Sequence, residues 1–407
     1  MGLRASGHAF TLIALYMITV MMRGAFYVTI AVIQSDKYLP ATPPTTWDVA
    51  LVLMIYPVSE LVSVSFFGSY SDKIGRKPIL TASLLMTAYA AFLFAITPDK
   101  VFIFAFAVLF GLGAASQVST SLSMIADCST EYNRARLMGY FDLATLGGLG
   151  GGYGAGILLI NAGMAATTIL FTATLMAAAG TMVASLLLRE TRKAARHDIS
   201  IGTLLRKVVR DRRIQKLMPV YIPIISLYGL VIANAESILE EHFTLQLNEL
   251  MILFAMLGGA LVLGIVVMGH LSDYLLKRRP FIVVGLIGFG LLAYLLVSNA
   301  EHFEALWGIW PVLPLLGFLA GSFPPAAMAY LTDVSSEEAR GSTMGVYSIF
   351  FGTGMIIGPT TGAFAYTNYG IWGLGVVVAI LIGVAIIGTY FMSEAHSQAQ
   401  RSEISGA

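Results

Sequence analysis

Two charged side chains interrupt long apolar stretches in the first part of the sequence. Arg23 lies near the middle of the apolar run 10–33, and Glu60 lies within the run 48–67. A charge at the centre of a bilayer costs about 2.5–3.5 kcal/mol on insertion scales, so such a residue usually faces a cavity or a partner charge. Glu60 is therefore a candidate proton carrier, and Arg23 is a candidate site for an anionic substrate. The structural alternative is a fixed Arg23–Glu60 pair that only orients two helices.

Aromatic and amide side chains at comparable depth could line a cavity beside these charges. In the first half they share a helix face with Arg23 or Glu60, and in the second half they lie on the seventh and tenth apolar runs. A cavity with one charged wall and one aromatic wall suits an amphiphilic organic solute. Side chains of the second-half kind more often pack in the protein interior than bind a substrate. The candidates are Phe26, Tyr27, Tyr56, Tyr221, Tyr228, Asn234 and Phe323.

A polar motif, G-S-Y-S-D-K-I-G-R-K, follows the second apolar run at residues 68–77. Gly75 permits a tight turn between two helices, and Asp72 can face the positive N-terminus of a neighbouring helix. A generic positively charged loop is the simpler alternative. The functional candidates in the motif are Gly68, Asp72, Lys73, Gly75, Arg76 and Lys77.

The motif recurs after the eighth apolar run, where Gly269 and Asp273 are kept but Leu276 stands in the place of Gly75. The two copies indicate that the sequence consists of two related halves. A parallel repeat of six helices is typical of transporters that rock two halves around a central site.

A second pair of equivalent loops follows the fourth and tenth apolar runs. A shift of 206 residues places Asp127 on Asp333 and Arg134 on Arg340. A carboxylate at a helix end, followed seven residues later by an arginine, can form a gate network that breaks on opening. The alternative is that these residues only cap helices and follow the concentration of positive charge on the cytoplasmic side of the membrane.

The same shift aligns two sets of glycines spaced by four residues. This spacing makes a flat helix face that another backbone can approach closely. The glycines are Gly148, Gly152 and Gly156 in the first half and Gly354, Gly358 and Gly362 in the second.

The motif at 68–77 resembles in full the loop pattern G-x-x-x-D-(R/K)-x-G-R-(R/K) of the major facilitator superfamily. The resemblance implies that Asp72 docks on the start of the eleventh helix, that the basic residues contact Asp127 and Asp142, and that the cluster controls conformation. Drug–proton antiporters of this superfamily carry a Gly-Pro signature in the fifth helix, whereas this chain has Gly152-Tyr153. Ala107 stands where the family usually has an arginine. Both departures weaken an antiporter assignment and leave the fold unaffected.

Composition supports an all-α integral membrane protein. The 407 residues are 57% hydrophobic and 12% charged, whereas soluble domains carry about a quarter charged residues. Spanning a bilayer takes roughly 20 apolar residues, and continuous runs of that length argue against a β-barrel. Cys128 is the only cysteine and a net charge of +1 does not suggest a nucleic-acid partner. Twelve runs are found at 10–33, 48–67, 79–97, 101–126, 139–160, 164–188, 217–237, 249–268, 280–298, 305–331, 345–366 and 370–392.

Lys and Arg are concentrated in alternate connections, which predicts that both termini are cytoplasmic. The first run is too long for a signal-peptide core, so it is expected to remain as a spanning helix. The long basic connection between the two halves, at 189–216, could carry an amphipathic surface helix or be a solvated linker. The predicted parts are a six-helix half at 1–188, a linker at 189–216, a second six-helix half at 217–393 and a tail at 394–407.

These observations predict a multi-pass plasma-membrane secondary transporter working by alternating access, with proton-coupled efflux of an amphiphilic or hydrophobic organic solute as the first choice. Proton-coupled symport or exchange of a small organic anion recognised by Arg23 is the alternative, and a sensor that binds without transporting is the alternative from another class. No G-x-S-x-G or H-E-x-x-H motif indicates an enzyme. We expect no metal or cofactor, a small-molecule substrate, the proton and the lipid bilayer as partners, and a monomer.

Overall fold

The computed structural model describes residues 2–32, 46–96, 100–192, 209–242, 247–299, 308–335 and 340–392, together with Thr203 and Arg206. All regular structure in these ranges is helical, as expected where lipid cannot satisfy backbone hydrogen bonds. Nine helical segments of the described residues are long and apolar enough to span a bilayer. The amphipathic helix considered for the linker lies mostly outside the described residues.

The chain divides into two compact units, each of which takes a short segment from the opposite half of the sequence. Unit 1 comprises Met1–Ser129, Tyr140–Val208 and Ser336–Ser348, and unit 2 comprises Thr130–Gly139, Val209–Ser335 and Ile349–Ala407. Two helices, α5 and α15, therefore begin in one unit and continue in the other. These crossings determine which residues meet at the site described below.

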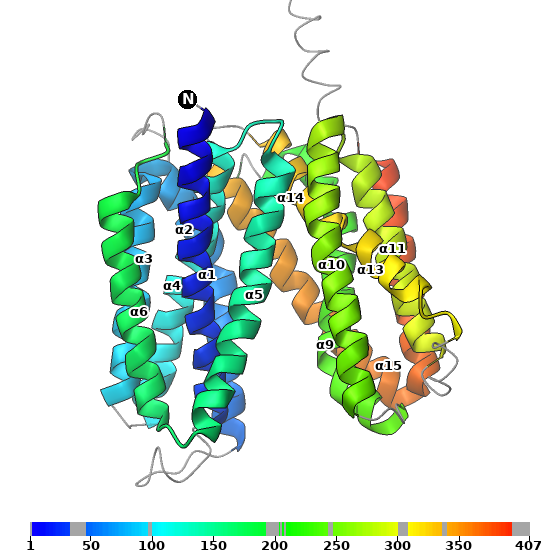
Figure 1. The fold of residues 1–407 in the computed structure, drawn as a ribbon, viewed down its shortest axis with the longest axis horizontal. Helices are drawn as coiled ribbons and strands as arrows, with labels where there is room; N and C mark the ends of the chain where they lie inside the picture. Colours follow the sequence, from blue (N-terminus) through cyan, green and yellow to red (C-terminus); the bar gives the residue numbers. More distant parts are fainter. Residues whose placement is uncertain are drawn as a thin grey trace, which may run out of the picture. The chain divides into compact units, whose positions relative to one another are not determined.

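The first half of the sequence forms six long helices. In unit 1, α4 packs against α2 and α3, and α6 packs against α1 and α3 (Figure 1). Small residues such as Ala90 and Ala107, with Phe94 and Phe110, fill the buried centre of this packing. The helices are α1 (Gly2–Val32), α2 (Thr46–Ile74), α3 (Arg76–Ile96), α4 (Lys100–Cys128), α5 (Arg134–Asn161) and α6 (Ala166–Leu187).

The second half begins with a short helical turn and continues with longer helices. In unit 2, α13 packs against α10 and α11, and α14 packs against α11. The helices are α8 (Arg212–Gln215), α9 (Met218–His242), α10 (Leu247–Leu275), α11 (Arg279–Ser298), α13 (Val312–Ala320), α14 (Phe323–Val334) and α15 (Arg340–Tyr390).

Three boundaries differ from the predicted ones. The run 305–331 contains two helices, α13 and α14, because Pro324 and Pro325 lack the N–H groups needed to continue α13. The eleventh and twelfth runs form α15, which changes direction at Gly370 (φ 61°, ψ −154°). The motif at 68–77 is mostly helix rather than loop, because α2 continues to Ile74 and α3 begins at Arg76.

Candidate functional site

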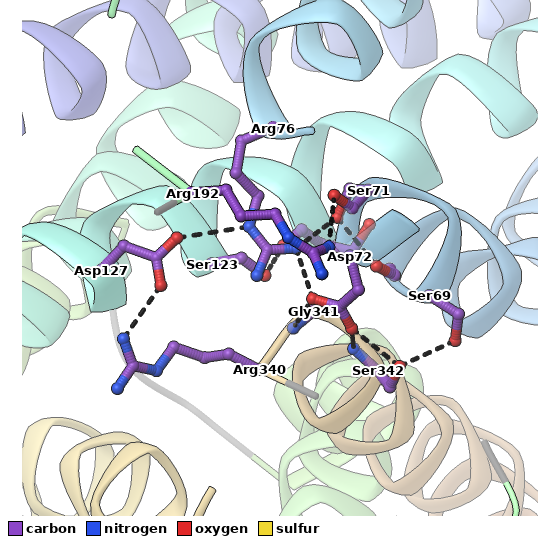
Figure 2. Close-up of polar contacts among 12 residues, drawn as sticks. Ser69, Ser71, Asp72, Arg76, Ser123, Asp127, Arg192, Arg340, Gly341 and Ser342 are labelled. Carbon is purple, nitrogen blue, oxygen red and sulfur yellow. Dashed lines mark hydrogen bonds and ion pairs between the residues drawn. The ribbon is translucent and has the colours of Figure 1, made fainter. Parts of the chain in front are cut away.

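Asp72 holds the beginning of α15. Its fully buried carboxylate accepts hydrogen bonds from the backbone N–H groups of Gly341 (2.9 Å) and Ser342 (2.7 Å) and from Ser342 Oγ (2.8 Å) (Figure 2). A helix N-terminus carries unsatisfied N–H groups and a partial positive charge, so a carboxylate stabilises it. This is the contact that the family resemblance implies.

Gly68 allows α2 to approach this helix start closely. A Cβ atom on Gly68 would collide with the carbonyl oxygen of Gly341. Two further hydroxyls join the contact, because Ser69 Oγ lies 3.0 Å from Ser342 Oγ. The approach of two backbones is therefore part of how the sequence positions Asp72.

A buried arginine connects Asp72 to the end of α4. Arg76 Nη1 lies 2.6 Å from Asp72 Oδ1, and Arg76 Nε lies 3.3 Å from Asp127 Oδ2. Arg340 Nη1 binds the other oxygen of Asp127 at 2.9 Å (Figure 2). Each charged group in this chain of contacts therefore has a partner of opposite charge, which a buried ionic group requires.

Glu190, which the sequence reasoning missed, completes this network from the segment after α6. Its carboxylate oxygens accept hydrogen bonds from the backbone N–H groups of Arg76 (2.9 Å) and Lys77 (3.0 Å), at the start of α3. Thr191 Oγ1 also donates to Asp127 Oδ2 (3.1 Å). Gly75 has no side chain with which to cap α3, so a carboxylate distant in sequence performs this role.

Unit 2 contains an equivalent anchor. The carboxylate of Asp273 on α10 accepts from the backbone N–H groups of Ala135 and Arg136 (2.8 Å each), at the start of α5. Arg278 Nη1 lies 2.8 Å from Asp273 Oδ1, and its Nε lies 3.0 Å from Asp333 Oδ2. Gly269 packs against this helix start. A Cβ atom at Gly269 would lie 3.5 Å from the carbonyl oxygen of Ala135.

The arginines of the two equivalent loops are exchanged. The sequence predicts that these carboxylates and arginines can form a gate network, without assigning the pairs. The structure pairs Asp127 with Arg340 and Asp333 with Arg134. The physical reason is the anchoring of the helix starts. Asp72 fixes the start of α15, which carries Arg340, beside the end of α4, and Asp273 fixes the start of α5, which carries Arg134, beside the end of α14.

Asp142, by contrast, forms no ion pair in the described part of the chain, so the expectation that it contacts the basic residues of the motif was wrong. Arg76 is directed to Asp72 and Asp127 instead. The side chains of Lys73 and Lys77 likewise form no ion pair with a described residue; Lys77 contributes its backbone N–H.

Arg23 and Glu60 form an ion pair in unit 1. Arg23 Nη1 lies 3.2 Å from Glu60 Oε1, and Arg23 Nη2 donates to the carbonyl oxygen of Ala114 (2.7 Å). The Arg23 side chain is 7% exposed and that of Glu60 is 24% exposed. The guanidinium is therefore committed to protein acceptors in this conformation, and a role for either residue in binding substrate or proton stays a prediction.

Three of the proposed cavity side chains are packed in the interior. Tyr56 lies against Phe110 and Tyr221 lies against Phe323, each with ring centroids 5.5 Å apart. Tyr228 is 38% exposed. The side chains of Phe26, Tyr27 and Asn234 lie outside the described residues. A substrate role for these residues stays a prediction.

The turn glycine of the first motif has a backbone conformation that its counterpart does not share. Gly75 has φ 125°, whereas Leu276 has φ 52°, in the left-handed region. We predict that Gly75→Ala destabilises the protein by about 1–3 kcal/mol, because only glycine adopts this conformation without strain. A Cβ atom would also lie 2.7 Å from Glu190 Oε2.

Leu276→Gly is the matched variant, and it should change the stability by no more than about 1 kcal/mol, since relief of strain and greater freedom of the unfolded chain oppose each other. Thermal unfolding of the purified proteins in detergent compares them. Equal melting temperatures for the two variants would contradict the assignment of a glycine-only turn.

The helices of the described residues and the two equivalent anchors are typical of a multi-pass membrane transporter. The model of the Major Facilitator Superfamily matches residues 12–233 and 217–406. The chain belongs to the major facilitator superfamily, whose members are transporters rather than enzymes, and it is a multi-pass plasma-membrane protein.

Similar proteins are found among multidrug and tetracycline resistance proteins. The chain is 26% identical to Multidrug resistance protein 2 of Bacillus subtilis over 349 residues, covering 82% of this chain and 84% of that protein. It is also 26% identical to the class E Tetracycline resistance protein of Escherichia coli over 356 residues, again covering 82% and 84%. The structure of the human organic anion transporter MFSD10 (TETRAN) shares the fold, with a TM-score of 0.74 and 17% identity over 96% of this chain and 99% of that one.

Proposed function

We propose that this chain is a secondary active transporter that exports small amphiphilic or hydrophobic organic compounds in exchange for protons, by alternating access. In this proposal the chain spans the membrane twelve times, with both termini in the cytoplasm, and it works as a monomer. Relatives named for multidrug and tetracycline resistance support export of organic compounds. The repeat of six helices in the sequence supports alternating access.

The observation that carries the proposal is the reciprocal pair of carboxylate anchors. Asp72 and Asp273 each hold the first N–H groups of a long helix and are each paired with a buried arginine. Opening toward the cytoplasm requires that α2 releases α15 and that α10 releases α5. Buried ionic contacts of this kind are either made or broken as a whole, which gives two discrete conformations rather than a continuum.

In this proposal conformational control and substrate binding lie at different depths. The anchors hold helix ends, whereas the Arg23–Glu60 pair lies within the apolar parts of α1 and α2. Because Arg23 already donates to Glu60 and Ala114, recognition of an organic anion would first have to break both contacts. This observation favours a neutral or cationic amphiphile over an anion.

Purified protein in liposomes that contain a pH-sensitive dye tests the proposal. We expect that tetraphenylphosphonium, a lipophilic cation, drives proton movement in wild-type liposomes but not in protein-free ones. Benzoate, a small organic anion, should drive none. Proton movement with benzoate alone would overturn the export proposal in favour of anion transport. No proton movement with either probe would overturn proton-coupled export of lipophilic cations.

A further inference from the structure

Asp142 differs from the paired carboxylates of the network. It lies on α5, eight residues after the helix begins, and its Oδ2 atom is buried without a hydrogen-bond partner among the described residues. Asp72, Asp127, Asp273 and Asp333 all bind arginine. Asp142 itself is half-buried, but a carboxylate whose buried oxygen lacks both a cation and a hydrogen-bond donor is expensive to keep ionised.

The surroundings of Asp142 within unit 1 are aromatic. The neighbouring Phe141 stacks on Tyr16 of α1, with ring centroids 4.2 Å apart. Asp142 interacts electrostatically with Tyr16 and with Tyr347, which lies seven residues after the start of α15. Tyr16 carries its own hydrogen bond with Thr145 of α5. The two groups with which Asp142 interacts are therefore phenols, which are neutral at physiological pH.

The charged groups on the adjoining helices are already paired with each other. Arg23 of α1 and Glu60 of α2 both act on Tyr16, and they form the ion pair described above. Among the described residues Asp142 forms no ion pair, and its buried Oδ2 atom accepts no hydrogen bond. Protonating Glu60 would leave Arg23 as a buried charge without its partner, whereas protonating Asp142 removes an uncompensated charge.

We propose that Asp142 is the carboxyl group that takes up and releases the coupled proton, while Glu60 keeps its ion pair with Arg23. The proposal rests on the proton-coupled transport proposed above. The step is a simple protonation: the carboxylate binds one proton from water to form the neutral acid, and it returns that proton to water when it becomes hydrated.

The position of Tyr347 links this step to conformation. Tyr347 belongs to the first two turns of α15, whose start is held by Asp72. When Asp72 releases that start, we expect Tyr347 to move with it and water to reach Asp142. Water then stabilises the ionised carboxylate and the proton leaves. When the start docks again, Asp142 is covered, and the neutral acid is the form that fits the apolar enclosure.

Infrared spectroscopy of the wild-type protein and Asp142→Asn tests the protonation without any substrate. We expect the wild-type spectrum to contain a carbonyl stretch of a protonated carboxylic acid at neutral pH, which disappears on alkaline titration and is absent from Asp142→Asn. Glu60→Gln should keep this band. Identical acid bands in the wild type and Asp142→Asn would overturn the proposal, even if transport itself were proton-coupled.

The transport assay then separates this proposal from the function on which it rests. With tetraphenylphosphonium as the probe, Asp142→Asn should lose substrate-driven proton movement but keep exchange of labelled probe across the membrane, and Asp142→Glu should restore proton movement. Glu60→Gln should be slower but keep the wild-type ratio of protons to probe. Loss of coupling in Glu60→Gln with full coupling in Asp142→Asn would overturn the role of Asp142 alone. Absence of proton movement in the wild type would overturn both proposals.

Discussion

Asp72→Ala is expected to destabilise the protein by about 3–5 kcal/mol, the cost of leaving one partner of a buried ion pair without the other. The substitution removes the acceptor for the N–H groups of Gly341 and Ser342 and leaves Arg76, which is 1% exposed, with Asp127 as its remaining carboxylate. Thermal unfolding in detergent should show a large fall in melting temperature. Asp273→Ala should cause a similar fall, because it removes the equivalent contacts at the start of α5.

Asp211→Ala is the matched control for the removal of a helix-capping aspartate. Asp211 accepts from the backbone N–H of Arg213 at the start of a surface turn, and its ion pair with that arginine is long (3.4 Å) and exposed. Exposed pairs contribute about 0–1 kcal/mol, so this variant should unfold near the wild-type temperature. An Asp72→Ala protein as stable as Asp211→Ala would contradict the anchor.

The single native cysteine gives a second measurement that does not depend on stability. Cys128 is half-buried and directly follows Asp127 at the end of α4. In Asp72→Asn, which keeps the size of the side chain, release of α15 should be more frequent. A membrane-impermeant maleimide should therefore label Cys128 faster in Asp72→Asn than in the wild type. An unchanged labelling rate would contradict the proposed control of opening by Asp72.

Gly152→Ala is expected to destabilise the protein by about 1–3 kcal/mol and to abolish transport, because the added methyl group overpacks a contact between two helix backbones. A Cβ atom on Gly152 would collide with the carbonyl oxygen of Met21 on α1. Gly24 of α1 has the same restriction, since its Cβ would collide with the carbonyl oxygen of Leu149 on α5. Melting temperature and probe transport measure the two effects.

Gly150→Ala is the control on the same helix, two residues away. A Cβ at Gly150 has no atom within 4 Å among its described neighbours, so the substitution should raise stability slightly, by about 0.5–1 kcal/mol, as expected for alanine in a helix. Gly154→Ala should behave in the same way. Destabilisation of equal size at Gly150 and Gly152 would show that the glycines serve helix flexibility rather than close packing.

The sequence predicts the helices well because their signal is strong. In a protein with so few charges, uninterrupted runs of about 20 apolar residues are typical of helices that span a bilayer. The ends of the helices are predicted poorly. The polar last turns of α2 and α10 carry Asp72 and Asp273, and hydropathy alone counts such turns as loops. Ends of this kind become helical because ion pairs and capping contacts satisfy them, and those contacts come from distant parts of the chain.

The site was predicted where residues of one motif act together and missed where the chain brings distant segments together. Asp72 and the helix start that it holds followed from the family pattern. Glu190, which caps α3, follows α6 by three residues and has no distinguishing neighbour in the sequence. The exchange of Arg134 and Arg340 was equally invisible, because a repeat shows that two loops are alike without showing which partners they take.

This exchange of partners bears on how such a chain could have originated. In each half of the sequence one aspartate caps a helix of the other half. A second aspartate, Asp127 or Asp333, binds the arginine of the other half. A precursor with only six helices would have had the same carboxylate, helix start and arginine on one polypeptide, but no means of joining them within it. Two copies of that precursor would satisfy every one of these groups by a self-complementary contact made twice, as in a symmetric dimer. Gene fusion would then preserve the dimer contact as an internal one, and two halves produced as separate polypeptides should still find each other through it.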